Sequence, residues 1–341
     1  MTYLTGKIAL DITAGAPNNA RGDNNVGEVK KLRIGRDVHP YVSAQAFRRW
    51  VRDSLPASEA RSPVVREGQG KKQQAYTKGR PDLYLDDDLF GYMVAIKNEN
   101  FQRDTVLATG TLVSVAPRPP KQDFGTMSRD FPVGEHPVIH EHELYSAELG
   151  GDILLDLPRV GTFEQDGGGL RRALAAGAAA EAINNGATET EFRDVKSIRL
   201  PLPERRRRAA LLLRTLAEVR GGAKRALHYG DRSPAFILLA PLKGGNNPFT
   251  RVLGVQDTKV FFNERVFSEE LDAWSGELDG PVSIGWAPGF LGDQRQHAQM
   301  MLAQEINAGR VVVGHPRTVL RSLADEIESG GRDGWFEDPR Q

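Results

Sequence analysis

The segment at 41–52, YVSAQAFRRWVR, combines an apolar side and a cationic side on one predicted helix. At about 100° per residue, Phe47, Trp50 and Val51 fall on one side. The opposite side carries Gln45, Arg48, Arg49 and Arg52. Ser43 stands where an N-cap belongs, and the free N–H groups of a first turn favour anions. The pattern predicts a helix that is anchored in a core and offers three guanidinium groups to an anion.

The alternative is a solvated helix face whose arginines pair with acids one turn away. Arg49 has Asp53 four residues on, whereas Arg48 and Arg52 have no acid one turn away on their side. The approach to the helix is also basic. Its cations are Arg21, Lys30, Lys31, Arg33 and Arg36. Eight basic residues against three acids between 21 and 52 favour polyanion binding over a solvated face.

Charge is segregated along a chain that is neutral overall. The 341 residues include 45 Lys and Arg and 45 Asp and Glu, which argues against a uniformly basic nucleic-acid binder. The segments at 61–80 and 204–225 are basic, whereas those at 135–156 and 264–279 are acidic. Separate surfaces of opposite sign would let the chain bind a polyanion on one and a copy of itself through both.

Several function classes are excluded by what the sequence lacks. Without cysteine there are no disulfides, thiolate metal sites or cysteine nucleophiles. No apolar run approaches the length of a transmembrane helix, and the first residues lack a signal-peptide pattern. We therefore expect a soluble cytoplasmic protein that does not contact a membrane.

Hydrophobic patterning predicts an α+β chain. Strands are expected at 3–14, 90–96, 105–115, 141–157 (a hairpin around Gly150 and Gly151), 234–241 and between 250 and 267. Helices are expected at 42–54, 168–185, 204–220 (ending at Gly221 and Gly222), 293–309 and 316–329. The core order of strand, helix, two strands, helix and strand is the ferredoxin-like or RRM order. We predict a single palm domain of that type over 1–341, with large insertions.

The predicted insertions are polar and lack apolar periodicity. Residues 15–40 read as a loop or irregular hairpin that forms a finger. A mobile excursion is expected at 56–89, because 56–82 is rich in Ser, Pro, Lys and Gln. The proline-rich segment at 116–140 is expected to protrude, and 290–341 to form a C-terminal helical region.

Other chemical motifs are weak. In EHPVIHEHELY, His140 and His142 would share a strand face with His136 further off, so a two-histidine metal site is the alternative to solvated histidines. Asp86, Asp87 and Asp88 are adjacent and are expected at a turn or strand start. No glycine stretch fits GxxxxGK[ST] or GxGxxG, and no serine lies in GxSxG. We expect no metal, no cofactor and no catalytic residues.

The block APNNARGDNNVGEVKKLRIGRDVHPYVSAQAFRRWVR at 16–52 resembles the backbone subunit of CRISPR Cascade complexes, the Cas-seven family. It is most similar to the DevR/Cst-type members of type I systems, of an I-B-like kind. Three later stretches agree with it: DDLFGYM at 87–93, EHELYSAELGGDILLDLPRVGTF at 141–163 and GGAKRALHYGDRSPAF at 221–236.

The resemblance implies an RRM-like palm with fingers and a thumb, and copies that stack head to tail along a CRISPR RNA in a helical filament for antiviral defence. The implied partners are that RNA, target DNA paired to it, a Cas-five-like protein and a large subunit. The residues implied to contact guide phosphates are Asn18, Asn19, Arg21, Lys30, Lys31, Arg33, Ser43, Gln45, Arg48, Arg49, Arg52, Lys224 and Arg225. The 116–140 protrusion would be the thumb, with Met127 and Phe131 as candidates to displace a base.

A non-catalytic RNA-binding scaffold is the leading hypothesis, because phosphate contacts hold any guide sequence. Two alternatives come from the same resemblance. Related type III subunits cleave target RNA with a loop aspartate, and Asp23 occupies the corresponding loop. The other alternative is a free-standing regulatory RNA-binding protein that works as a monomer.

Overall fold

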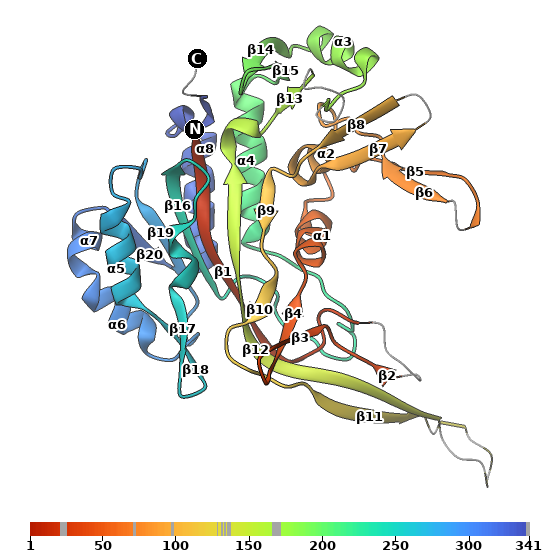
Figure 1. Cartoon of the computed structure of the whole chain (residues 1–341), viewed down its shortest axis with the longest axis vertical. Coiled ribbons are helices and arrows are strands. Elements are labelled where there is room, and N and C mark those ends of the chain that lie inside the picture. Colours follow the sequence, from red (N-terminus) through yellow and green to blue (C-terminus); the bar gives the residue numbers. More distant parts are fainter. Residues whose placement is uncertain are drawn as a thin grey trace.

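The computed structural model describes residues 1–20, 26–70, 73–96, 99–127, 129–130, 132, 134, 138–165 and 172–338. It is a mixed α/β structure built on a large, mostly antiparallel central sheet (Figure 1). In spatial order its strands are β20 (Val311–Gly314), β19 (Val282–Trp286), β16 (Phe236–Lys243), β1 (Thr2–Gly15), β12 (Val138–Asp156), β10 (Leu112–Ser114), β4 (Asp37–Val42) and β3 (Lys31–Ile34). Three further strands pair with β12, namely β2 (Val26–Gly27), β9 (Leu107–Thr109) and β11 (Lys121–Met127).

The predicted first strand is the centre of this sheet. β1 pairs antiparallel with β12 on one edge and with β16 on the other. Its apolar residues Leu4, Ile8, Leu10 and Ile12 are buried in one hydrophobic cluster, while Ala9 belongs to a second cluster. Because successive side chains of a strand point to opposite faces, both faces of the sheet are covered.

Helices cover these two faces. The helices of the described chain are α1 (Ala44–Ser54), α2 (Leu85–Phe90), α3 (Ala176–Asn184), α4 (Leu202–Leu216), α5 (Glu264–Ala273), α6 (Gln294–Met301), α7 (Ala303–Asn307) and α8 (Pro316–Glu328), with 3-10 turns η2 (Leu157–Arg159), η3 (Pro248–Arg251) and η4 (Asp333–Phe336). α1, α4 and α8 bury apolar residues in the first cluster, and α5 and α6 do so in the second. The helices expected at 42–54, 204–220 and 316–329 are confirmed, and α6 and α7 divide the one expected at 293–309.

Smaller sheets and hairpins complete the chain. They are β5 (Val64–Glu67) with β6 (Gln74–Thr77), β7 (Tyr92–Ile96) with β8 (Glu99–Arg103), β13 (Thr162–Glu164) with β15 (Val195–Arg199) and β14 (Thr188–Phe192), and β17 (Leu253–Gln256) with β18 (Lys259–Phe262). β5 to β8 protrude on one side of the molecule (Figure 1). Part of the segment at 56–89 forms a regular hairpin and a helix, and the mobility that the sequence predicts for it stays a prediction.

The hairpin predicted around Gly150 and Gly151 is wrong, because β12 runs through both residues without a turn. A Cβ on Gly151 would lie 2.6 Å from Cδ2 of Leu112, and one on Gly150 would lie 2.9 Å from Cγ2 of Val115. The two glycines therefore mark a close approach of neighbouring chain segments to the strand. They do not mark a chain reversal.

The first seven residues of β12 pair with β11 and leave the body of the molecule. The register runs from Lys121↔Leu144 to Met127↔Val138. We call this two-stranded protrusion (121–127 with 138–144) the arm; it is the lower extension in Figure 1. The strand at 121–127 and the residues at 138–140 lie within the segment at 116–140 that the sequence predicted to protrude, whereas 141–144 lie beyond it.

The sequence did not predict the strands β19 and β20. Both faces of β19 are buried, so its residues do not alternate between apolar and polar. β20 pairs with it in parallel, from Val282↔Val311 to Gly285↔Gly314. These strands extend the sheet beyond β16 within the C-terminal third of the chain.

A buried ion cluster joins α2, β8 and α4. The Asp88 side chain is fully buried; its Oδ2 accepts from Nη1 of Arg208 at 2.8 Å, and its Oδ1 pairs with Nη2 of Arg103, which is also fully buried. The backbone N–H of Gly161 also donates to Asp88 Oδ2, at 3.0 Å. The turn or strand-start role predicted for these aspartates is wrong, since Asp88 neutralises two buried guanidinium groups.

We expect Asp88→Asn to lower the free energy of unfolding by about 3–5 kcal/mol, because two buried cations would lose their shared counterion. Chemical denaturation measures the change. Asp53→Asn is the matched control, since its partner Arg49 is exposed and the loss there should stay below about 1 kcal/mol. Equal losses for the two variants would contradict a structural role for the cluster.

Candidate nucleic-acid interface

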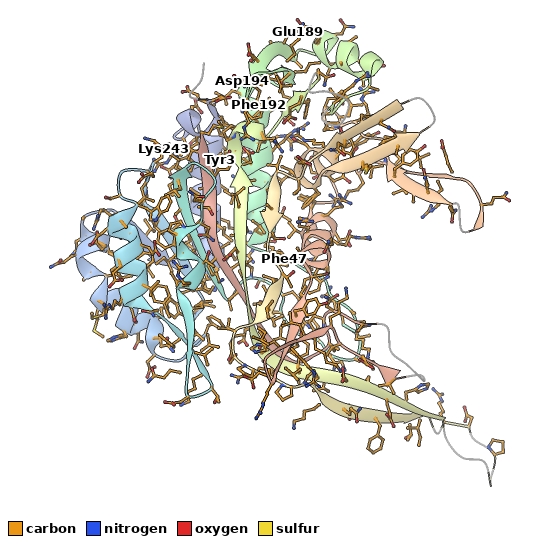
Figure 2. All side chains as sticks on the ribbon, viewed as in Figure 1. Tyr3, Phe47, Glu189, Phe192, Asp194 and Lys243 are labelled. Carbon is orange, nitrogen blue, oxygen red and sulfur yellow. The ribbon has the colours of Figure 1, made fainter. Side chains whose placement is uncertain are left out.

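The predicted helix is α1, and it is fixed at its start and along its apolar side. Ser43 precedes it in an extended conformation, and its Oγ accepts from the Ala46 N–H at 3.4 Å. Phe47 and Val51 are fully buried, and the rings of Phe47 and Trp50 pack edge to face at 6.2 Å. Figure 2 shows Phe47 where α1 meets the central sheet. Because this side is held in the core, the orientation of the opposite side is set.

The cationic side of α1 consists of Gln45, Arg48, Arg49 and Arg52. Arg49 pairs with Asp53, as predicted, with Nε 2.8 and 2.7 Å from the two carboxylate oxygens. Within the described residues, no carboxylate forms an ion pair with Arg48 or Arg52. Two of the three guanidinium groups therefore have no counterion in the part of the chain that the structure describes.

Arg48 and Arg52 lie close enough for their charges to repel each other. Burial, and then the charge of Arg52, lower the pKa of Arg48 from its ordinary value. The Arg52 guanidinium lies 5.2 Å from the ring centroid of Phe90, and its buried Nε has no partner in the described part of the chain. An anion at this position would satisfy that donor and relieve the repulsion between the two cations.

The segment before α1 is tied down by its own backbone and carboxylates. The Asn18 amide donates to the Tyr41 carbonyl at 3.3 Å, so this side chain is used in holding the segment. The Lys31 ammonium contacts Glu143 and lies 3.4 Å from Glu28, which neutralises it within the chain. The β3–β4 hairpin, the alternative expected for 15–40, is present.

Two further cations of this segment, Arg33 and Arg36, are open to solvent. Arg33 and Arg36 are exposed on the β3–β4 hairpin, and Asn19 is exposed where it bridges to Val29. Within the described residues, no ion pair involves Arg33 or Arg36. Lys30 is half-buried, with its backbone N–H donating to the Asn18 carbonyl at 2.9 Å. The free positive charge before the helix therefore lies on the hairpin.

Some predicted positions fall outside what the structure describes. Arg21, Asp23 and Phe131 lie outside the described residues, as does His136. Met127 ends β11 at the far end of the arm, and its side chain is outside the described part.

The glycine-rich loop at 221–230 joins α1 to the segment before it. A Cβ on Gly221 would lie 2.5 Å from Cγ of Trp50, so this backbone packs directly on the indole ring. The Ala223 N–H donates to the Pro17 carbonyl at 2.9 Å, and Lys224 Nζ donates to the Gly27 carbonyl at 3.4 Å. Arg225 is exposed. The structure thus brings the sequence blocks at 16–52 and 221–236 together, and the packing of Gly221 on Trp50 was not visible from the glycine pair alone.

A histidine pair lies where this loop meets the arm. The rings of His142 and His228 are 5.0 Å apart, and His142 Nε2 is 3.5 Å from Oδ2 of Asp123. Burial, and then the neighbouring His142 and Lys224, lower the pKa of His228. Among the described residues there is no group of three or more side chains suited to a metal ion.

We expect Gly221→Ala to lower the free energy of unfolding by about 1–3 kcal/mol, because the added methyl group overlaps Trp50. Gly177→Ala in α3 is the control, since a Cβ there meets open space and should instead stabilise by up to about 1 kcal/mol. Denaturant titration of both variants compares them. A neutral Gly221→Ala would show that the loop does not press on α1.

We expect His228 to make the fold acid-sensitive. Its pKa is lowered in the folded state, so the unfolded chain binds the proton more readily and stability falls as the pH drops below about 6.5. The fall in melting temperature between about pH 7 and pH 5 should be smaller in His228→Gln. Exposed His297→Gln should leave that fall unchanged. Identical pH profiles for wild type and His228→Gln would refute the assignment.

The interface lies on the concave side of the molecule. In Figure 1, α1 stands between the arm and the β5–β8 hairpins, and both project on the side of the molecule that carries α1.

None of the described helices is long and apolar enough to span a membrane.

No family model and no curated protein matches the sequence. The fold, however, is similar to that of a chain of a solved CRISPR RNA-guided surveillance complex, pre-nicking, with a TM-score of 0.59 and 10% identity over 95% of this chain and 100% of the other. It is also similar to a chain of a second CRISPR RNA-guided surveillance complex, with a TM-score of 0.54 and 14% identity over 95% and 98%. At such low identity the likeness shows a common fold along nearly the whole length of each chain.

Proposed function

We propose that this chain is a non-catalytic, guide-RNA-binding backbone subunit of a type I CRISPR Cascade effector, in the Cas-seven family and of an I-B-like, DevR/Cst kind. The observation that carries the proposal is a pair of guanidinium groups, Arg48 and Arg52, on a core-anchored helix. Neither forms an ion pair with any described residue. The fold shared with chains of surveillance complexes supports it.

The order of the central strands supports a ferredoxin-like palm. β16, β1, β12 and β10 are neighbours in that order, with α1 between β1 and β10 in sequence and α4 between β12 and β16. This places the fourth core strand beside the first, then the third and the second, with both helices packed in the same cluster. The hairpins β5–β8 and the arm are then insertions in the palm.

Phosphate binding explains why the proposed interface is cationic. A guanidinium binds phosphate oxygens with two parallel N–H donors and stays charged even when partly buried. Such contacts carry no sequence information, which suits a subunit that must accept any guide. Arg33, Arg36 and Arg225 are exposed cations that would extend the same track.

The arm suits contact with a neighbouring copy. It projects from the palm and carries exposed Phe124 on β11 and exposed Ile139 on β12. Head-to-tail stacking would place each arm on the next subunit in a helical filament in the cytoplasm. Target DNA would pair with the exposed guide, and a Cas-five-like protein and a large subunit would complete the complex.

Protein made together with a CRISPR array should purify with RNA, and Arg48→Gln combined with Arg52→Gln should remove it. A plot of the logarithm of the binding constant against the logarithm of the salt concentration should also become less steep. Its slope should change by about 0.7 for each lost phosphate contact and by about 1.4 for the pair. Nucleic-acid absorbance and binding titrations at several salt concentrations measure both effects.

Arg251→Gln with Arg265→Gln removes the same charge from exposed positions away from α1 and should keep the RNA. The proposal fails if the α1 variant retains as much RNA as this control, or if wild type strongly prefers one guide sequence.

A further inference from the structure

A second cluster of arginines lines a small pocket that shares only Arg225 with the proposed track. The pocket, of about 220 Å³, lies between the end of α4, the loop at 225–233 and the first turn of α8. We call it the arginine pocket, and its cations are Arg220, Arg225, Arg232 and Arg317, with Tyr229 beside them. A hydrogen bond links it to α1, because the Arg220 N–H donates to Oγ of Ser54, the last residue of that helix, at 2.7 Å.

The acids of the pocket are already engaged. Oε1 of Glu218 forms an ion pair with Nη2 of Arg317 at 2.9 Å and another with Arg321. The Asp231 carboxylate accepts from the Ser233 N–H at 3.0 Å and from its hydroxyl at 2.5 Å. Within the described residues no ion pair involves Arg220, Arg225 or Arg232, so the pocket keeps excess positive charge.

Arg232 is buried with two donors that have no hydrogen-bond partner among the described residues. It is only 2% exposed, and Nη1 donates to the Asp231 carbonyl at 2.9 Å. Its Nε and Nη2 are buried and have no hydrogen-bond partner in the described part of the chain. Burying a cation with unsatisfied donors is costly, so a residue of this kind is normally paired with an anion.

Tyr229 adds an aromatic surface to the same place. It is 83% exposed, and it lines both the arginine pocket and a neighbouring groove of about 750 Å³. Arg232 lines both hollows as well. A lone exposed tyrosine needs no explanation. Proteins that bind single-stranded nucleic acids, however, combine an exposed aromatic ring with nearby cations: the phosphate binds the cations and a base stacks on the ring.

We propose that the arginine pocket binds one nucleotide of a single strand, with its phosphate against Arg225, Arg232 and Arg317 and its base stacked on Tyr229. This inference rests on the proposed RNA-binding function and adds a base contact to a phosphate-led interface. Stacking tolerates every base, so the contact leaves guide sequence free.

The test measures binding of the full chain to an oligouridylate, to the same strand without bases, and to inorganic phosphate. Tyr229→Ala should weaken binding of the oligouridylate about tenfold and leave binding of the base-free strand unchanged. Tyr229→Phe should bind like wild type. Arg225→Gln with Arg317→Gln should weaken both strands alike, whereas Arg251→Gln with Arg265→Gln should weaken neither.

Three results would overturn the nucleotide site: no effect of Tyr229→Ala, an equal effect on both strands, or inorganic phosphate that binds the pocket and leaves strand binding unchanged. The variant Arg48→Gln with Arg52→Gln distinguishes failure of the nucleotide site from failure of the proposed RNA-binding function in the same assay. If it loses RNA while the pocket variants bind normally, the pocket assignment is wrong and the proposed function stands. If wild type binds no strand, both are wrong.

Discussion

The burial of one side of α1 determines what the rest of the interface can do. Phe47, Trp50 and Val51 hold the helix in the core, and the backbone at Gly221 closes over Trp50 from the other side. Two chain segments that are far apart in sequence are thereby fixed on one helix. The arginines opposite Phe47 need no further support, because a helix whose apolar side is held cannot rotate to hide them.

The described arginines differ from one another in whether they form an ion pair with a carboxylate. Most of the strong ion pairs are structural, as in the Asp88 cluster or where Arg207 joins Glu204 and Glu59. The overall charge is zero, so the chain holds enough carboxylates to neutralise every cation. In the described structure Arg48, Arg52 and Arg232 nevertheless form no ion pair with a carboxylate. Unpaired cations are therefore a local property of the cationic side of α1 and of the arginine pocket. A hydrogen bond between Arg220 and Ser54 links these two sites.

Features set by local sequence could be predicted, and features set by distant contacts could not. Three features depend only on residues close to one another in sequence: the period-2 pattern of β1, the Ser43 cap and the Arg49–Asp53 pair. Gly150 and Gly151 look like a turn until their neighbours across the sheet are known, and β19 lacks alternation because both of its faces are covered. Asp88 and Arg232 show the same limit, since only the fold reveals which buried charge has a partner.

The continuity of β12 has a geometric consequence. One strand serves as the outer half of the arm and then as the neighbour of β1 in the middle of the sheet, and its pairing with β1 shifts register between Ile12 and Gly15. Its pairing with β11 ends at Leu144, and its pairing with β1 begins at Tyr145. An irregularity of this kind bends a strand and increases its local twist. The direction in which the arm leaves the sheet is therefore set at this point, where the segment at 16–20 also leaves β1.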